Sequence, residues 1–141
     1  VCGWTTVNAD RLVAEARAVM GNAYAPYSEF HVGAALLGQD GSVYVACNVE
    51  NGSYGLTVWA ERAAVGNAVA AGVRNYVAVA IVTDGDGPVG PCGACRQVLA
   101  EFAPTMRVIS EAGGRRREWT LDELLPEPFD GLLGRPGGIE D

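Results

Sequence analysis

The alternation of apolar and polar positions predicts one amphipathic helix followed by two strands. Asn8 or Asp10 is placed to cap a helix whose apolar positions recur at helical spacing, and Gly21-Asn22 marks its end. Two apolar runs follow at residues 32–37 and 43–48, and the Asp-Gly pair between them is typical of a hairpin turn. The first third of the chain therefore predicts a helix and an antiparallel strand pair.

The middle of the chain predicts two further helices around a buried strand. The alanine-rich segment 58–71 has helical character and is closed by Gly72. Residues 76–83 form a continuous run of β-branched and apolar residues, which is typical of a strand covered on both faces. We expect this strand at the centre of a sheet. After a turn-rich stretch, residues 92–102 predict a helix that ends before Pro104.

The last third predicts one or two strands and a short helix. Residues 107–110 supply a strand, and residues 118–120 are expected to add another. Thr120 and Glu123 have the spacing of a capping box, which opens a helix. The order of elements predicts a single domain over residues 1–141, an α/β fold with three α/β/α layers.

Composition and charge narrow the possible functions. Hydrophobic residues make up 49% of the chain and charged residues 19%, and no apolar run approaches the roughly 18 residues that span a bilayer. No signal-peptide pattern is present, so we expect a cytoplasmic protein without membrane contact. The net charge of −7 disfavours a nucleic-acid partner. The one basic run, residues 115–117, is expected at a hairpin turn and without a function.

Two of the four cysteines form a closely spaced pair. Cys92 and Cys95, in the segment PCGAC, lie at a predicted helix start, where free N–H groups and the helix dipole stabilise thiolates. Their i, i+3 spacing suits tetrahedral zinc. The same motif is typical of a thioredoxin-like redox pair, and less often of two buried structural cysteines. By itself, the pair leaves metal and redox chemistry open.

A glutamate upstream of this pair favours metal chemistry. Ala60-Glu61-Arg62 begins another predicted helix. Taken alone, Glu61 is more often a solvated carboxylate of a first helical turn. A glutamate two positions after a ligand, followed later by Pro-Cys-x-x-Cys, is however the pattern of zinc deaminases. The combination favours metal-assisted deamination over redox chemistry.

Five motifs together make the chain resemble the small, homotetrameric, zinc-dependent cytidine deaminases. In order, they are APYSEF with VGAAL at 25–36, CNVEN at 47–51, AER at 60–62, PCGACRQV at 91–98, and LLP at 124–126 with Phe129. The resemblance implies a five-stranded mixed sheet flanked by helices and one zinc per chain. It also implies a nucleoside substrate, a role in pyrimidine salvage and a homotetramer.

The resemblance also implies a catalytic mechanism. Cys92 and Cys95 would be zinc ligands, and Arg62 would orient their thiolates. Glu61 would take a proton from zinc-bound water, whose pKa the metal lowers to about 7, and would return protons to cytosine N3 and to the departing ammonia. The implied enzyme is a hydrolase that converts cytidine or deoxycytidine to uridine or deoxyuridine and ammonia.

Substrate contacts are implied at five positions: Phe30, Asn48, Glu50, Ala60 and Phe129. Asn48 and Glu50 would bind the ribose hydroxyls, although both could instead only shape the loop after a strand. Phe30 would lie against the pyrimidine, and Phe129 would reach into the site of a neighbouring subunit.

One position departs from the family pattern. Where the resemblance places the first zinc ligand, two residues before Glu61, the chain has Trp59. An indole has one N–H donor and no lone pair free for a metal. Neither Cys47 nor His31 is expected to replace the missing ligand. Family members do not use the cysteine at position 47 as a ligand, and His31 is expected on the surface. Arg62 could stack on Trp59, three residues away.

Three hypotheses therefore remain. The chain is a cytidine deaminase whose zinc binding and activity are impaired by Trp59, whether this residue is natural or engineered. Alternatively, it is a deaminase-fold enzyme of altered, metal-free chemistry on a cytidine-like or nucleoside-antibiotic substrate, with Glu61 as acid or base. In the third hypothesis it is a non-catalytic nucleoside-binding protein. The retention of the other site residues favours the first.

Overall fold

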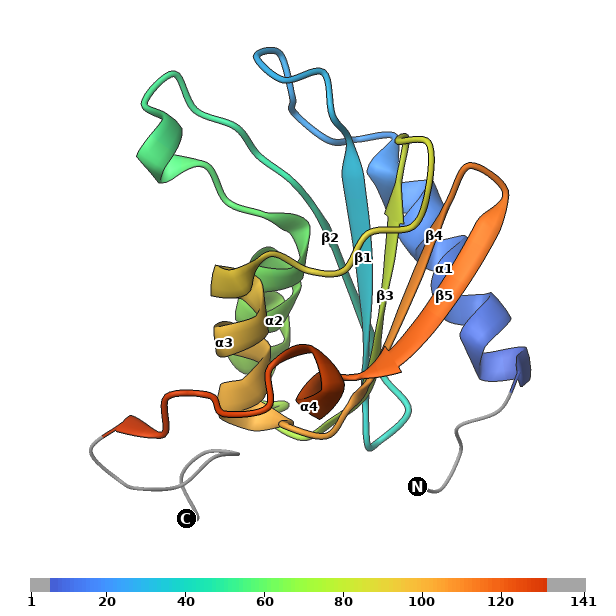
Figure 1. Cartoon of the computed structure of the whole chain (residues 1–141), viewed down its shortest axis with the longest axis vertical. Helices are drawn as coiled ribbons and strands as arrows, with labels where there is room; N and C mark the ends of the chain where they lie inside the picture. Colours follow the sequence, from blue (N-terminus) through green and yellow to red (C-terminus); the bar gives the residue numbers. More distant parts are fainter. Residues whose placement is uncertain (1–5, 132–141) are drawn as a thin grey trace.

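Five strands form one mixed sheet in the computed structural model, which describes residues 6–131 (Figure 1). Their order across the sheet is β2-β1-β3-β4-β5, with β3 and β4 parallel and the other neighbours antiparallel. The strands are β1 (Val32–Gly38), β2 (Val43–Cys47), β3 (Tyr76–Thr83), β4 (Arg107–Ala112) and β5 (Arg115–Thr120). The five-stranded mixed sheet and its central strand are as predicted.

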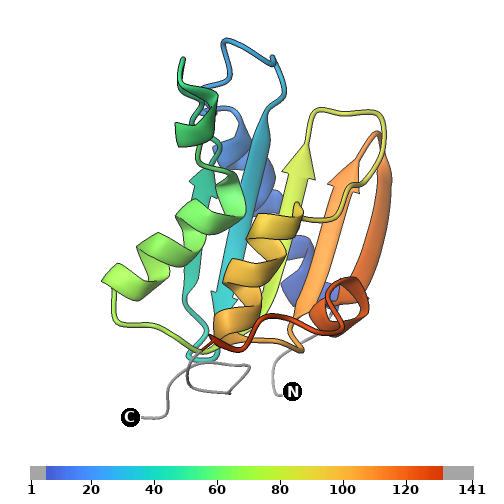
Figure 2. The same ribbon diagram turned by 60° about the vertical axis from the view of Figure 1, so that its left-hand side comes forward.

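Helices cover both faces of the sheet. Helix α1 (Thr6–Met20) lies on one face, while α2 (Ala60–Ala70) and α3 (Gly93–Phe102) lie side by side on the other (Figure 2). The short helix α4 (Leu121–Leu124) follows β5, and a 3-10 turn, η1 (Tyr54–Leu56), precedes α2. This arrangement confirms the three α/β/α layers. Within the described residues, no helix is both long and apolar enough to cross a membrane.

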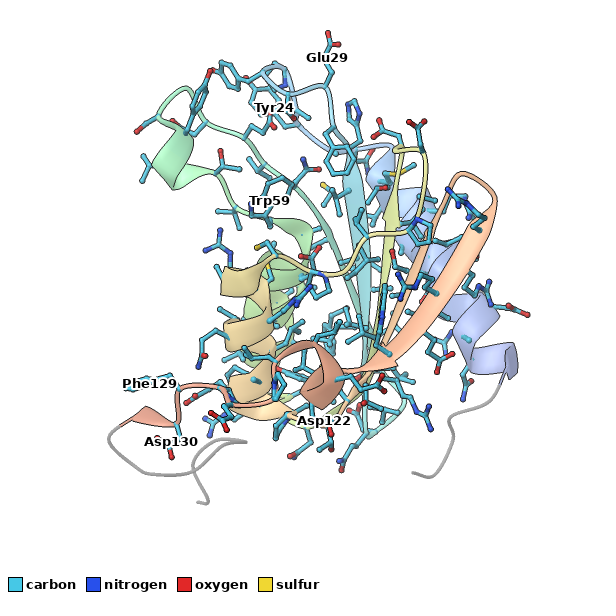
Figure 3. All side chains as sticks on the ribbon, in the orientation of Figure 1. Tyr24, Glu29, Trp59, Asp122, Phe129 and Asp130 are labelled. Carbon is cyan, nitrogen blue, oxygen red and sulfur yellow. The ribbon has the colours of Figure 1, made fainter. Side chains whose placement is uncertain are left out.

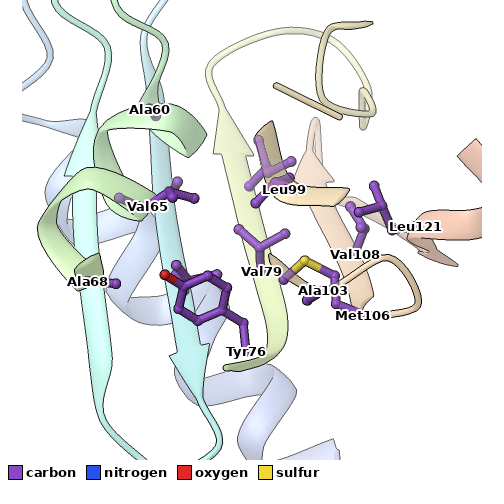
Figure 4. Close-up of a cluster of buried hydrophobic side chains, with 14 of the residues drawn as sticks. Ala60, Val65, Ala68, Tyr76, Val79, Leu99, Ala103, Met106, Val108 and Leu121 are labelled. Carbon is purple, nitrogen blue, oxygen red and sulfur yellow. The ribbon is translucent and has the colours of Figure 1, made fainter. Parts of the chain in front are cut away.

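The two faces of the sheet carry separate hydrophobic clusters. Every residue of β1 and of β3 is buried, because helices lie above and below both strands. The cluster beneath α2, α3 and α4 is drawn in Figure 4; it includes Val65, Tyr76, Val79, Leu99, Val108 and Leu121. The cluster beneath α1 includes Leu12, Val13, Ala35, Ala80 and Ile109. The first of these clusters supports the two helices that carry the candidate site.

Helix α1 packs directly on β1 through a glycine. A Cβ atom added at Gly33 would lie 2.0 Å from the Ala16 carbonyl oxygen, so this close approach requires glycine. The predicted cap of α1 is wrong, because the helix starts at Thr6 and therefore contains both Asn8 and Asp10. The Asp10 carboxylate accepts a hydrogen bond from Arg116 at 2.7 Å.

The basic run lies in a strand and not at a turn. Strand β5 begins at Arg115, earlier than expected, and the turn before it is made by Gly113 and Gly114 with φ values of 58° and 74°. Arg116 donates to Glu111 across this hairpin at 2.8 Å. The run therefore contributes ion pairs on the sheet surface.

Candidate functional site

A buried carboxyl group lies in the first turn of α2. Glu61 is only 4% exposed. Burial raises the pKa of its carboxyl group, and a hydrogen bond with Cys95 and the charge of Arg62 oppose this rise. A carboxyl group with a raised pKa is suited to taking up and returning protons near neutral pH.

The cysteine pair lies at the start of α3 and contacts this carboxyl group. Cys92 is the N-cap of the helix and is exposed, whereas Cys95 is buried in the first turn. The backbone N–H of Cys95 donates to the Cys92 Sγ at 3.4 Å. Burial, followed by the charge of Glu61, raises the pKa of the Cys95 thiol. The first turns of α2 and α3 thus bring together Glu61, Cys92 and Cys95, the residues that the sequence motifs predicted as the catalytic acid–base and the zinc ligands.

A cavity of about 150 Å³ opens beside these helix starts, and we call it the inner cavity. Its walls are mostly apolar, with Glu61 and Cys92 among the few polar groups. The lining residues are Phe30, Val32, Trp59, Glu61, Ile81, Thr83, Val89, Gly90 and Cys92. Sequence reasoning missed five of them: Val32, Ile81, Thr83, Val89 and Gly90. Side chains two positions apart on a strand share a face, so Ile81 and Thr83 lie on one face of β3, and Val32 of β1 lies opposite Thr83 in the sheet.

A second, wider cavity of about 380 Å³ lies next to it, and we call it the outer cavity. It is lined by Tyr27, Ser28, Glu50, Tyr54, Thr57 and Trp59. The rings of Tyr27 and Tyr54 meet edge to face with centroids 5.9 Å apart. Trp59 lines both cavities, and Figure 3 shows its side chain between the start of α2 and the loops at the end of the sheet.

Backbone pairing fixes the position of Trp59. It is the N-cap of α2, in an extended conformation, and its carbonyl oxygen accepts from Ala63 at 3.1 Å. The preceding residue, Val58, exchanges two hydrogen bonds of 2.9 Å with Val49, which also bridges to Tyr24. The tryptophan is therefore held at the junction of the two cavities by the chain on both sides of it.

The side chains at this site do not form a three-donor metal site. Among residues 6–131, no three His, Cys, Asp or Glu side chains are grouped so that they could hold a metal ion. Cys47 is half-buried on β2, and His31 is engaged at the surface, where its Nδ1 lies 2.6 Å from the Asp84 carboxylate. A three-thiolate zinc site therefore does not fit the part of the chain that the structure describes, where only the thiols of Cys92 and Cys95 lie at this site.

Comparison with known proteins identifies the family. The profile of the cytidine and deoxycytidylate deaminase zinc-binding region matches residues 6–112. The chain belongs to this deaminase family. A cytidine deaminase of Sporosarcina psychrophila is 48% identical over 125 residues, which cover 87% of this chain and 92% of the relative. A cytidine deaminase of Halalkalibacterium halodurans is 51% identical over 120 residues, covering 84% and 91%.

A solved structure supports the same assignment at the level of the fold. The crystal structure of cytidine deaminase from Burkholderia pseudomallei matches with a TM-score of 0.82 and 48% identity. The match covers 85% of this chain and 98% of that one. The five-stranded fold predicted from the motifs is therefore the fold of the family.

In this deaminase-family chain, both ends of the Asn48 side-chain amide form hydrogen bonds with the surrounding backbone. The residue is 0% exposed, its Oδ1 accepts from the Val32 N–H at 2.9 Å, and its Nδ2 donates to the Phe30 carbonyl at 2.8 Å. Asn48 thus holds the segment that leads into β1 and places Phe30 at the inner cavity. Its contact with a ribose stays a prediction.

The replacement Asn48→Ala is expected to destabilise the fold by about 2–4 kcal/mol, because it leaves one buried donor and one buried acceptor without partners. Asn51→Ala is the matched control, since Asn51 is exposed and accepts one hydrogen bond from Ser53 at 2.9 Å. The control should lose less than about 1 kcal/mol. Urea unfolding of the three proteins measures the difference, and equal losses would contradict the structural role of Asn48.

Glu50 ties the loop before β1 to the outer cavity. Its carboxylate accepts from the backbone N–H of Tyr27 at 3.0 Å, from that of Ser28 at 3.1 Å, and from the Ser28 hydroxyl. The hydroxyl hydrogen bond holds the pKa of Glu50 below its ordinary value of 4.5, although desolvation acts in the opposite direction. The carboxylate therefore stabilises this loop, and its contact with a ribose stays a prediction.

Thermal unfolding tests the role of Glu50 through its pH dependence. Because the pKa is lowered in the folded state, the stabilisation is present above 4.5 and is lost as the pH falls through the lowered value. We expect Glu50→Gln to melt a few degrees below the parent chain at about pH 7, and this gap to narrow as the pH falls below 4.5 and through the lowered pKa of Glu50. The neighbouring, exposed Glu29→Gln is the control and should show no such gap. A gap that is independent of pH would contradict the ionic role.

Three other predicted residues lie apart from the cavities. Arg62 donates to the Thr57 carbonyl at 3.1 Å, and its buried Nε has no hydrogen-bond partner. The suggested stacking of Arg62 on Trp59 does not appear among the cation–π contacts of the described residues. Ala60 is buried in the core beneath α2. Phe129 is 65% exposed, lines neither cavity and, as Figure 3 shows, lies far from Trp59.

Proposed function

We propose that the chain is a hydrolase of the cytidine deaminase type, acting on cytidine or deoxycytidine, in which Trp59 reduces zinc binding and turnover. The observation that carries this proposal is the buried carboxyl of Glu61 beside Cys92 and Cys95 at the inner cavity. Close relatives are named cytidine deaminases.

The two cavities suit the two parts of a nucleoside. A cavity of about 150 Å³ is large enough for a six-membered ring, so the inner cavity accommodates a pyrimidine base. Phe30 supplies an apolar wall for the base, and Glu61 is placed to exchange protons with it. The outer cavity then receives the sugar, and the Glu50 carboxylate, which also accepts from Tyr27 and Ser28, is one acceptor there for hydroxyl groups.

Trp59 accounts for the reduced activity. The family pattern calls for a third thiolate at this position, and an indole supplies no metal ligand. Arg62, one helical turn away, has a buried Nε that lacks an acceptor. A thiolate at position 59 would offer such an acceptor.

Zinc content and cytidine turnover of the purified chain test the proposal. We expect zinc far below one equivalent per chain and slow formation of uridine and ammonia. One equivalent of zinc with rapid turnover would contradict the impairment by Trp59. A complete lack of product at every zinc concentration, with cytidine and with deoxycytidine, would reject deamination by this chain.

The second candidate is a nucleoside-binding protein without catalysis. It is favoured by the lack of a three-donor cluster among the described residues. Saturable binding of cytidine, measured by calorimetry, together with no turnover above the uncatalysed rate would select it. Turnover that disappears in Glu61→Gln would exclude it.

We also propose a homotetramer, as the resemblance implies. Large apolar side chains are exposed along β2, α2 and the segment between them: Val45, Val49, Tyr54, Leu56, Val58 and Val69. Tyr54 is 75% exposed, which is unusual for a large aromatic ring unless a partner covers it. Sedimentation equilibrium at micromolar concentration should give four times the chain mass, and a monomer would contradict the proposal.

A further inference from the structure

The cysteine pair has the arrangement of a dithiol at a helix start. Cys92 occupies the N-cap position and Cys95 the third helical position of α3. The hydrogen bond from the Cys95 N–H to the Cys92 Sγ draws this sulfur over the first turn, toward the residue that carries the second sulfur. One helical turn at a helix N-terminus is the spacing at which Cys-x-x-Cys disulfides form.

The two sulfurs differ in their access to solvent. Cys92 is exposed and lines the inner cavity, so a small disulfide compound can reach its sulfur. Cys95 is 0% exposed and faces Glu61. One sulfur is therefore available for attack from outside, and the other can be reached only by its neighbour in the same turn.

The residues around the pair do not commit it to a metal. Both cysteines are free thiols, and within residues 6–131 no third His, Cys, Asp or Glu side chain is grouped with them so that the three could hold a metal ion. The neighbouring position that could have supplied one is Trp59, which lines the inner cavity together with Cys92. If Trp59 reduces zinc binding as proposed, the two thiols are left available for other chemistry.

We infer that Cys92 and Cys95 form a reversible intrachain disulfide with small-molecule disulfides such as oxidised glutathione. The Cys92 sulfur attacks one sulfur of the glutathione disulfide, forms a mixed disulfide and releases one glutathione. The Cys95 sulfur then attacks the Cys92 sulfur, and the second glutathione leaves with the proton of Cys95. In total, the two protein sulfurs lose two electrons and two protons, and two reduced glutathione molecules are formed. This chemistry is independent of any nucleoside and does not rest on the proposed deamination.

The test uses the full chain with Cys2→Ser and Cys47→Ser, so that Cys92 and Cys95 are the only thiols. The reduced, metal-free protein is equilibrated with glutathione buffers of increasing oxidised fraction, quenched in acid and examined by intact mass and thiol titration. We expect the thiol count to fall from two to zero, the mass to decrease by two hydrogen atoms, and dithiothreitol to reverse both changes. As a control, the same protein is unfolded in guanidinium and treated with the same buffers; its oxidation shows that the oxidant is active.

Two results would overturn the inference. The first is a native protein that keeps both thiols under conditions that oxidise the unfolded chain. The second is a lasting glutathione adduct on Cys92 with Cys95 still reduced. One equivalent of zinc should leave the oxidation unchanged, and protection of both thiols by zinc would instead assign the pair to a metal.

Single replacements test the different roles of the two sulfurs. With Cys95→Ser added, the remaining thiol should collect one stable glutathione, because no second sulfur displaces it. With Cys92→Ser added, the buried Cys95 should react at least about tenfold more slowly with glutathione disulfide than Cys92 does. Equal rates would contradict the assignment of Cys92 as the attacking sulfur. Neither measurement depends on turnover. A result that contradicts the disulfide inference is therefore distinct from a result that contradicts the proposed deaminase function.

Discussion

Trp59→Cys is expected to raise the zinc content from well below one to about one equivalent per chain, and to raise cytidine turnover by at least about 100-fold. Loss of a group that only orients a metal ligand commonly costs 10–100-fold in affinity or activity, so restoring a ligand should have at least that effect. Cys92 and Cys95 already lie at the adjacent helix start, and a thiolate at position 59 would complete a tetrahedral set with one open position. Metal analysis and the release of ammonia measure the two effects.

Trp59→Ser separates the new ligand from the removal of bulk. Serine clears the same space but gives zinc no thiolate, so it should leave zinc content and turnover near those of the parent chain. If the serine variant gains as much as the cysteine variant, steric blocking of the inner cavity is the cause. If the cysteine variant binds one zinc per chain and still leaves cytidine unchanged, deamination is not its reaction.

Local patterns were sufficient to predict the elements that carry the site. The run from Tyr76 to Thr83 is apolar without alternation, and β3 proved to be the central strand, buried on both faces. The Cys-x-x-Cys spacing and the following helical pattern placed Cys92 and Cys95 at the start of α3. These features depend on residues close in sequence, which a single sequence displays directly.

The features that could not be predicted depend on contacts between distant segments. The sequence shows that position 48 is an asparagine, but not that both ends of its amide are used by Val32 and Phe30. The starting point of α1 was wrong: Asp10 lies inside the helix, and its carboxylate pairs with Arg116, a residue far along the chain. Propensity and capping rules act over a few residues and do not include such partners.

The position of Trp59 links the proposals for this chain. Trp59 lines both cavities, so it borders the space beside Glu61 and the space beside Glu50. A nucleoside that occupied both cavities would therefore lie against Trp59. By the family pattern the same position would carry the third thiolate beside Cys92 and Cys95, so under the proposals above one residue would affect substrate access, metal binding and the state of the thiols.

Glu61→Gln, placed in the Trp59→Cys chain, is expected to lower kcat/KM for cytidine by about 10²–10⁴-fold, the range by which a positioned acid or base accelerates a reaction. Glutamine keeps the shape of the side chain but cannot take up and return a proton. Glu101→Gln, an exposed carboxylate on α3, is the matched control and should leave turnover unchanged. Zinc content is measured in parallel and should stay near one equivalent in both variants, because the three thiolates remain. A Glu61→Gln variant that keeps both its zinc and its turnover would remove this carboxyl group from the reaction, and a variant that loses zinc would assign it to the metal site instead.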